Sequence, residues 1–388
     1  MRILVVSPFQ PHPLADHGGG VYLGAFLASL MTRAEVAAVH FQHSDDCPPM
    51  AGLTVYSEPR LRNPEMNGWQ LWAQRIRLIR DWGVRGSPLE VAKHRSAGFA
   101  VLLRQAITEF KPEIALVEFT VMAQYLPILS GIKTVFTDHE RGQSLPKKFG
   151  PGNIGRRRDR RLWRRYVQRF YPLAGLCQAL NQDDAAHLTG LTNSPVRVRP
   201  ALVNIPKEPV DPAKSGRVLF FFGNYTHHPN PEAACHLARE VLPRVQKLLP
   251  DTKLWLAGPK ATPAVEALAE LEGVRVLGYV ENIHGLMREV RCLVAPVFSG
   301  SGTRIKVAMA MAHGLPVVSN KLGLRGLTAP PEAVATGESA DQLAAACVHF
   351  LRDPAAAAAA GSHARQFIVD SMGGDILLQQ QLERFRDL

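Results

Sequence analysis

The sequence predicts an α/β protein made of two Rossmann-like, doubly wound domains that face each other across a cleft. The chain has 388 residues, which is long for one hydrophobic core and suits two domains. Short apolar runs alternate with helical stretches, as expected for a parallel sheet with crossover helices. In the second half each apolar run ends in a small-residue turn. Strands that deliver such turns to one edge of a sheet build a cleft along that edge.

Composition favours a globular protein of the cytoplasm. Apolar residues make up 46% of the chain and charged residues 20%. No apolar run reaches the roughly 20 residues that cross a bilayer, and the first residues have too short an apolar run for a signal peptide. The five cysteines are scattered without CxxC pairs, which favours a reducing compartment and predicts no metal site.

The first half reads as a series of strands, each followed by a loop or helix. The loop after the first strand ends in Gly18, Gly19 and Gly20, ahead of a helical stretch over 21–30. Another strand runs directly into the tetrapeptide TDHE, which contains His139. The expected strands are 2–6, 36–41, 53–56, 113–119, 132–136, a segment within 173–181, and 196–201.

The net charge of +11 calls for an anionic partner, and it is concentrated in one predicted helix. Between Arg156 and Arg169 eight arginines accompany a single acidic residue, Asp159. Apolar residues recur there at helical spacing: Leu162, Trp163, Tyr166, Val167 and Phe170. A solvated face of a domain helix and a membrane-surface helix are equally compatible with this pattern. A nucleic-acid patch is less favoured, because no aromatic-interleaved motif accompanies it. We therefore expect peripheral contact with an anionic membrane, at its inner face, and no nucleic acid.

A change in composition marks the domain boundary. Residues 204–217 (NIPKEPVDPAKSGR) are rich in proline and polar residues, as in a linker. The predicted domains are therefore 1–203 and 218–370. A C-terminal helix over 371–388 can return to the first domain.

The most specific stretch is LVAPVFSGSGTRIKVAMAMAHGLPVVS, residues 293–319. It predicts a buried strand, a small-residue loop at Gly300, Ser301 and Gly302, and a helix opening near Thr303. Glycines allow close backbone approach, and the free N–H groups of a first helical turn suit phosphate. Arg304 and Lys306 add two positive charges there. The pattern predicts an anion site at the carboxyl edge of a parallel sheet.

The second half resembles the family-4 retaining glycosyltransferases. The similarity rests, in order and spacing, on FFFGNYTHHPNPEAACHL, LWLAGP, GYVEN, GSGTRIK and AMAHGLPVVS. In the first half it is thinner and rests on RILVVSP, the triple glycine and the His of TDHE. The resemblance implies the GT-B fold, a nucleotide-sugar donor bound by the second domain, and an acceptor bound by the first.

The resemblance also implies roles for individual residues. Arg304 and Lys306 would hold the donor diphosphate and help expel it, and His139 would lie near the transferred sugar. Gly258 and Val280 would border the nucleobase. Further donor-binding positions implied in this way are Gly18, Gly19, Gly20, Gly223, Asn224, Gly300, Ser301, Gly302 and Thr303.

Met309 and Arg325 depart from the family pattern, whereas Ser301 is common in the GSGT-type branch of the family. The family carries a pair of glutamates eight positions apart, and here these positions are Ser301 and Met309. The second glutamate binds the donor ribose, and a thioether cannot accept a strong hydrogen bond from two hydroxyls. Arg325 also stands where an acidic residue is usual.

The function expected from these features is retaining transfer of a sugar from a UDP- or GDP-linked donor. The acceptor would be a glycan or a lipid-linked hydroxyl in cell-surface polysaccharide or glycoconjugate synthesis. No Asp-x-Asp motif is apparent, so we expect metal-independent transfer with no further cofactor. The alternative, motivated by Met309 and Arg325, is a non-catalytic nucleotide-sugar-binding module or partner subunit. A GT-B sugar-nucleotide epimerase is less favoured, because it needs acidic residues around the sugar.

Overall fold

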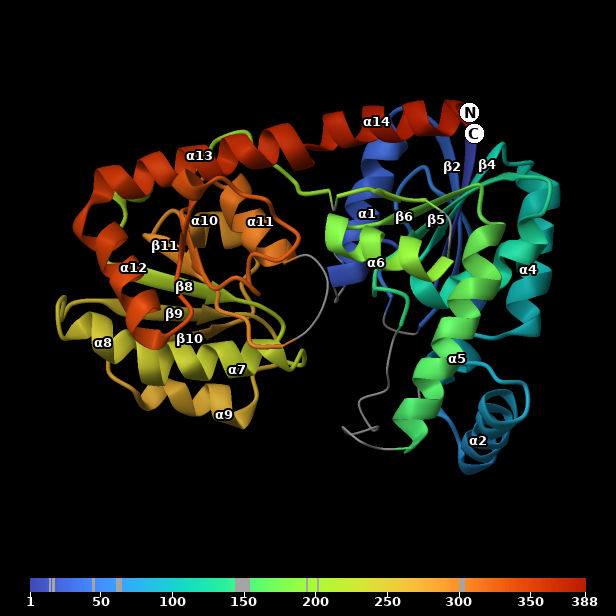
Figure 1. Cartoon of the computed structure of the whole chain (residues 1–388), viewed down its shortest axis with the longest axis horizontal. Helices are drawn as coiled ribbons and strands as arrows, with labels where there is room; N and C mark the ends of the chain where they lie inside the picture. The colour runs from blue at the N-terminus through green and yellow to red at the C-terminus, as the bar shows by residue number, and fades with distance from the viewer. Residues whose placement is uncertain are drawn as a thin grey trace. The chain divides into compact units, whose positions relative to one another are not determined.

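The computed structural model of the chain forms two compact units (Figure 1). Unit 1 contains Met1–Pro200 and Leu378–Leu388, and unit 2 contains Ala201–Leu377. The structure describes residues 1–13, 15, 18–43, 46–60, 65–143, 154–192, 195–200, 202–299 and 304–388.

Unit 1 is built on a parallel sheet of seven strands in the order β3-β2-β1-β4-β5-β6-β7. Its central strands are apolar on both faces, as a sheet covered on both sides requires. In β1, for example, Ile3 and Val6 are fully buried. The strands are β1 (Arg2–Ser7), β2 (Glu35–Gln42), β3 (Thr54–Pro59), β4 (Ile114–Glu118), β5 (Lys133–Asp138), β6 (Leu176–Ala179) and β7 (Val196–Val198). The helices are α1 (Gly18–Leu30), α2 (Gly68–Gly83), α3 (Leu89–Lys93), α4 (Ala97–Phe110), α5 (Ile154–Phe170) and α6 (Gln182–Thr192).

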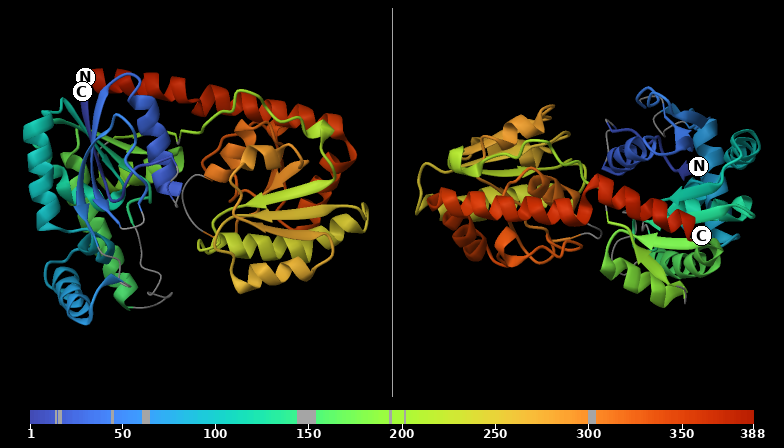
Figure 2. Two further views of the ribbon diagram at one scale, coloured as in Figure 1. Left: turned by 180° about the vertical axis from the view of Figure 1, so that it is seen from behind. Right: turned by 90° about the horizontal axis from the view of Figure 1, so that it is seen from above.

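Unit 2 repeats the plan with six parallel strands in the order β10-β9-β8-β11-β12-β13. Helices cover both faces of this sheet (Figure 2). The strands are β8 (Val218–Phe222), β9 (Lys253–Ala257), β10 (Val274–Gly278), β11 (Cys292–Val294), β12 (Val317–Ser319) and β13 (Val334–Thr336). The helices are α7 (Pro229–His236), α8 (Leu242–Gln246), α9 (Pro263–Glu266), α10 (Ile283–Met287), α11 (Ile305–Ala312), α12 (Ala340–Arg352), α13 (Pro354–Met372) and α14 (Gly374–Arg386), the last of which continues into unit 1.

The two sheets share one topology, and this fixes where ligands are expected. Counted from the start of its own unit, each sheet has a 3-2-1-4-5-6 core order, so the two predicted doubly wound domains are confirmed. The strand order reverses between β1 and β4 in unit 1 and between β8 and β11 in unit 2. Ligands of such sheets bind beyond the carboxyl ends of the strands at this switch point.

The segments around the unit boundary are held by specific contacts. The proline-rich segment 204–217 belongs to unit 2, where Arg365 Nη2 donates to Pro206 O at 2.7 Å and Val210 N donates to His313 O at 2.8 Å. Residues 378–388 belong to unit 1, where Gln178 Nε2 donates to Gln381 Oε1 at 3.1 Å. The end of the chain therefore completes the first unit.

One local expectation is wrong. The triple glycine does not precede the first helix, because α1 already begins at Gly18. Of the two equally weighted interpretations of the arginine-rich helix, the structure favours a domain helix with a solvated face, because Leu162, Trp163, Tyr166 and Val167 of α5 are all buried in unit 1. Among the described residues, no helix is long and apolar enough to cross a bilayer.

Candidate functional site

At the carboxyl edge of the sheet in unit 2, three glycines end adjacent strands. Gly223 follows β8, Gly258 follows β9 and Gly278 ends β10. Gly258 N donates to Gly278 O at 2.6 Å, and a Cβ on Gly258 would lie 2.0 Å from Gly223 O. The φ of Gly258 is +138°, a conformation that other residues rarely adopt. This edge therefore requires glycine and presents bare backbone.

Lys306 of α11 reaches this edge. Its Nζ donates to Asn230 Oδ1 at 2.6 Å and lies 4.0 Å from the centroid of the Phe221 ring. Asn230 Nδ2 in turn donates to Asn224 O at 2.7 Å. A Cβ on Gly223 would lie 2.8 Å from the Lys306 ammonium. The structure thus brings together Gly223, Asn224 and Lys306, which the sequence had singled out separately.

The electrostatics of this edge favour an anion. Burial, with a further contribution from Arg304, lowers the pKa of Lys306 to about 7. Burial and the neighbouring Arg325 likewise lower the pKa of Arg304. Arg325 thus disfavours the charge of Arg304, and Arg304 disfavours the charge of Lys306, near the start of α11. A bound polyphosphate would relieve this repulsion and restore the ordinary protonation of Lys306.

Other predicted donor residues have no assigned contact with this cluster. Gly300, Ser301, Gly302 and Thr303 lie outside the described residues. Met309 is half-buried on α11, and Val280 is half-buried in the loop after β10. Their roles stay predictions.

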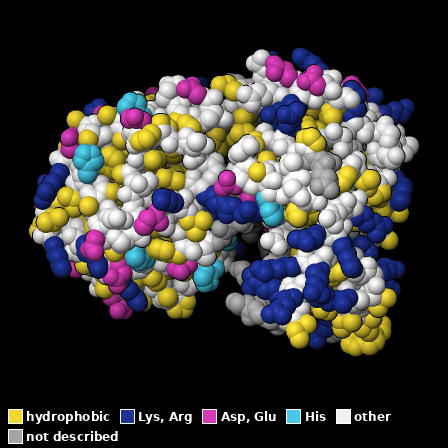
Figure 3. All heavy atoms as spheres, in the orientation of Figure 1, with side chains coloured by type: hydrophobic (Ala, Val, Ile, Leu, Met, Phe, Trp, Pro, Cys, Tyr) yellow, Lys and Arg dark blue, Asp and Glu magenta, His cyan; other side chains and the backbone are white. Residues whose placement is uncertain are grey.

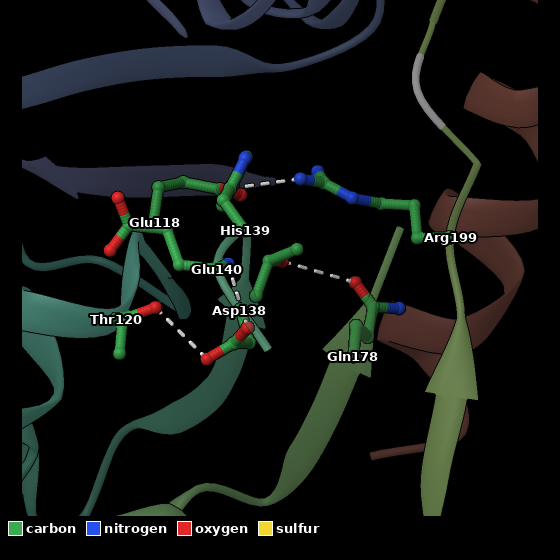
Figure 4. Close-up of polar contacts among 8 residues, drawn as sticks. Glu118, Thr120, Asp138, His139, Glu140, Gln178 and Arg199 are labelled. Atoms are coloured by element: carbon green, nitrogen blue, oxygen red, sulfur yellow. Dashed lines mark hydrogen bonds and ion pairs between the residues drawn. The ribbon is translucent and has the colours of Figure 1, made fainter. Parts of the chain in front are cut away.

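The switch point of unit 1 carries a buried charged cluster that sequence reasoning missed in part (Figure 4). His139 directly follows β5, and its Nε2 lies 2.7 Å from Glu118 Oε2 at the end of β4. Arg199, which follows β7, donates from Nη2 to the same oxygen at 2.9 Å. Side-chain exposure is 1% for Glu118, 4% for Arg199 and 7% for His139. Glu118 could have been found from the sequence, because it is a carboxylate at the end of the apolar run EIALV.

The protonation of this cluster follows from its contacts. Burial alone would raise the pKa of Glu118, but the charge of Arg199 and the hydrogen bond from His139 outweigh burial and hold that pKa below its ordinary value. The ionised carboxylate accepts from Nε2–H of His139, so a neutral imidazole keeps Nδ1 as its acceptor. Glu118 and Arg199 therefore fix the ring and its tautomer.

An aromatic ring and a second carboxylate also hold His139 and its turn in place. Phe119 stacks on the imidazole with centroids 3.9 Å apart and has a φ of +73°, a strained value for a large side chain. Asp138 holds the turn, because its Oδ1 accepts from Glu140 N at 2.9 Å and its Oδ2 accepts from Thr120 Oγ1 at 2.9 Å. Tyr171 also donates to Asp138. Strain of this kind persists where the surroundings over-determine the geometry.

The middle residue of the triple glycine, Gly19, has a packing explanation within unit 1. A Cβ on Gly19 would lie 2.9 Å from Phe9 Cζ and 3.0 Å from Phe119 Cζ. The first turn of α1 therefore fits closely over the ring that stacks on His139. Gly18 and Gly20 belong to the same turn, and the predicted approach of all three glycines to the donor stays a prediction.

Unit 1 also has a cationic cavity of about 420 Å³. It lies at the carboxyl ends of β2 and β3 and is bounded by α2. Four cationic side chains and one carboxylate line it: Arg60, Arg77, Lys93, Arg95 and Glu58. Burial, with a smaller contribution from Arg77, lowers the pKa of Arg60. The cavity suits a ligand that carries negative charge.

Comparison with known proteins identifies both the second domain and the fold. Residues 216–353 match the sequence profile of the family described as glycosyl transferases group 1. No curated protein sequence matches the chain.

Several solved structures are similar over the whole chain. Sucrose-phosphate synthase from Thermosynechococcus elongatus has a TM-score of 0.71 at 15% identity, with 100% of this chain and 98% of that chain covered. HepE of Anabaena, in complex with UDP-glucose, has a TM-score of 0.65 at 14% identity, with 100% of each chain covered. WaaG, a glycosyltransferase involved in lipopolysaccharide biosynthesis, has a TM-score of 0.64 at 12% identity, with 99% of each chain covered. The chain thus has the GT-B fold, and its second domain carries the sequence signature of the group 1 glycosyltransferases.

Proposed function

We propose that this protein is a retaining glycosyltransferase of the family-4 type that uses a nucleotide-sugar donor. The observation that carries the proposal is the contact of Lys306 with Asn230 beside Gly223, within the region that matches the group 1 profile. This arrangement has the elements of a diphosphate site: bare glycine backbone, a desolvated ammonium and the start of a helix. HepE, which shares the fold, binds UDP-glucose.

Charge stabilisation of the leaving nucleoside diphosphate is the main catalytic contribution in this proposal. Lys306 and Arg304 supply fixed positive charge where negative charge develops, so transfer proceeds without a metal ion. Retention follows if the acceptor attacks on the face that the diphosphate leaves, with a phosphate oxygen taking the acceptor proton. No protein nucleophile is then required.

His139 contributes a positioned hydrogen-bond acceptor in the proposed mechanism. Its Nδ1 would accept from a hydroxyl of the transferred sugar, while Glu118 and Arg199 hold the ring. A fixed partner of this kind costs no reorganisation at the moment of reaction. Glu118 and Arg199 are thus positioning residues.

The acceptor in this proposal is a glycan or a lipid-linked molecule that bears an anionic group. The cavity lined by Arg60, Arg77, Lys93 and Arg95 supports that choice, because a phosphate or carboxylate there would be met by several guanidinium N–H donors. The setting we propose is the cytoplasm, at the inner face of the membrane, in cell-surface polysaccharide or glycoconjugate synthesis.

A second candidate function is a non-catalytic nucleotide-sugar-binding module or partner subunit. Met309 favours it, because a thioether gives the donor ribose no strong acceptor. Arg325 favours it as well, since it adds a cation beside Arg304. Both functions need donor binding, and only the first needs turnover.

A thermal-shift panel followed by a turnover assay separates these candidates. UDP, GDP, ADP, CMP and their common sugar conjugates are each added to the full chain, since a ligand of the native state raises the melting temperature. We expect a shift with UDP or GDP and with the matching sugar conjugate, and release of the nucleotide from that conjugate in the presence of acceptor. A shift without release supports the module. Flat curves with every nucleotide would contradict both functions.

A further inference from the structure

Helix α2 of unit 1 exposes an apolar stripe. Trp69, Trp72, Ile76 and Ile79 follow one another at steps of three, four and three residues, so they lie on one helix face. Their exposed fractions are 70%, 55%, 45% and 68%. The two indole rings stack with centroids 5.1 Å apart. A helix on the surface of a globular protein normally turns such a stripe toward the core, so its exposure calls for a partner.

The rest of α2 is anchored in unit 1, so the helix cannot simply rotate to bury the stripe. Arg77 donates from Nη1 to Arg95 O at 2.9 Å. Asp81 is buried and pairs with Arg85 at 3.1 Å. The helix begins with a capping box between Asn67 and Gln70. The Arg77 bond attaches α2 to the segment around Arg95 and so holds the stripe outward, while the other two contacts stabilise the helix itself.

Positive charge surrounds the stripe. Arg75 and Arg80 of α2 are exposed, and so is Arg85, which lies two residues beyond the end of the helix. Helix α5 lies alongside, because Trp82 Nε1 donates to Asp159 Oδ1 at 2.9 Å and Arg158 Nη2 donates to Gly83 O at 2.7 Å. Figure 3 shows an apolar patch at the lower edge of unit 1 with many basic side chains beside it. The exposed arginines of α5 are Arg157, Arg158, Arg160, Arg161, Arg164, Arg165 and Arg169.

We propose that this surface, formed by the α2 stripe and the exposed arginines of α5, docks on an anionic lipid bilayer. Tryptophan at the level of the lipid headgroups and isoleucine below it are the side chains that interfacial helices use. Arginines flanking them match the negative surface of such a bilayer. The division of roles differs from the sequence expectation: α2 inserts, and α5 contributes charge alone because its own apolar residues are in the core.

Charge complementarity selects the bilayer over other partners. Two copies of this chain meeting through the surface would bring two sets of arginines together, which opposes a symmetric dimer. A nucleic acid would satisfy the arginines but would leave the two isoleucines and two tryptophans without an apolar environment. A bilayer satisfies both parts of the surface. This inference depends on the geometry of unit 1 and holds whether or not the protein transfers a sugar.

Vesicle sedimentation of the full chain tests the proposal. The probes are vesicles of phosphatidylcholine alone and vesicles that also contain phosphatidylglycerol. We expect binding to the second kind only, weakening as salt is added. Two sets of substitutions separate the contributions: Trp69→Ser with Trp72→Ser removes apolar area, and Arg157→Gln with Arg160→Gln and Arg164→Gln removes charge. Each set should lower the partition coefficient by about tenfold or more.

Controls make the outcome decisive. Arg239→Gln with Lys247→Gln removes two exposed charges from unit 2, and Tyr279→Ser removes a side chain there that is 74% exposed. These variants should bind the vesicles as the unchanged chain does, and all variants should keep its melting temperature. Four results would overturn the proposal. The first three are equal binding by every variant, no binding to the anionic vesicles, and a dimer in solution that the tryptophan substitutions dissociate. The fourth is binding of a DNA duplex that displaces the vesicles and is unchanged by the tryptophan substitutions.

Discussion

The two switch points of this molecule have the same strand order but opposite electrostatic designs. In unit 1, the carboxylate of Glu118 is buried between its cationic partner, the Arg199 guanidinium, and the Nε2–H donor of His139. In unit 2, the ammonium of Lys306 contacts neutral groups among the described residues, the Asn230 amide and the Phe221 ring. The charge of Glu118 is already neutralised within the protein, so it contributes to the stability of the fold as long as Arg199 is present. The charge of Lys306 has only neutral groups around it among the described residues, so it can pair with a ligand.

The comparison can be tested first by breaking the pair in unit 1. Replacing Glu118 with Ala leaves the Arg199 guanidinium buried without its counter-ion, so we expect unit 1 to lose about 3–5 kcal/mol of unfolding free energy. Urea unfolding followed by probes in each unit measures this loss. The double replacement Glu118→Ala with Arg199→Met should recover part of it. If the single replacement costs no more than the double one, the two charges are not coupled as described.

The matching change in unit 2 should affect binding and spare stability. Lys306→Met removes an ammonium that burial already disfavours, so the melting temperature should stay constant or rise. Affinity for the nucleoside diphosphate should fall by about 2–4 kcal/mol, because one direct charge contact is lost. Calorimetric titration with UDP and GDP measures the fall. Lys306→Arg, which keeps the charge, is the matched control and should retain more affinity than Lys306→Met. A stability loss as large as that in unit 1 would remove the contrast between the two sites.

How much of this contrast the sequence could predict depends on the range of the interactions. Local patterns were sufficient for most strands of both sheets, since apolar runs followed by small-residue turns mark parallel strands, and for the glycine edge of unit 2. They missed β13, the three-residue strand at the edge of the unit 2 sheet. Local patterns were insufficient for Glu118, because its partner Arg199 lies 81 positions away and is found only after the chain folds.

Helix faces were the other limit of sequence reasoning. The spacing of Leu162, Trp163 and Tyr166 correctly marks one face of α5, but spacing does not say whether that face meets a core or a membrane. Trp69 and Trp72 of α2 have a similar spacing, but they are exposed, whereas Leu162, Trp163 and Tyr166 are buried. The start of α1 was missed because Gly19 has low helix propensity, and packing on Phe9 and Phe119 overrides that propensity.

The glycines provide a second, smaller contrast between the units. A Cβ on Gly223 would meet Asn230 Nδ2 at 2.7 Å and Lys306 Nζ at 2.8 Å, both at the ends of side chains that can move. Gly223→Ala should therefore cost about 1–2 kcal/mol in diphosphate affinity, since it displaces the ammonium, and less in stability. Gly19→Ala meets two aromatic rings and should instead lower the melting temperature. Thermal melts and diphosphate titrations of both variants measure the effect of each replacement on stability and on affinity.

Proton linkage gives the finest distinction. The pKa of Lys306 is about 7 in the native state and ordinarily 10.5, so between these values the unfolded chain binds the proton and the native chain does not. The ligand-free protein should therefore gain stability as pH rises from 7 toward 10, relative to Lys306→Met. A bound diphosphate raises the pKa again, so affinity for a nucleotide sugar should fall by up to about 1.4 kcal/mol per pH unit above pH 7. Parallel melts and titrations across this range would show both slopes. Lys306→Arg should show neither slope, because arginine keeps its proton throughout.

The central claim is that the Lys306 edge of unit 2 binds the donor diphosphate as a charged ligand. Its most direct test is calorimetric titration of UDP-glucose, or of the GDP sugar if the melting panel selects one, at pH 8 in two buffers with different enthalpies of ionisation. The account predicts that binding takes up close to one proton in the unchanged chain and none in Lys306→Met or Lys306→Arg. Equal proton uptake in all three chains would contradict it, and so would an unchanged donor affinity in Lys306→Met.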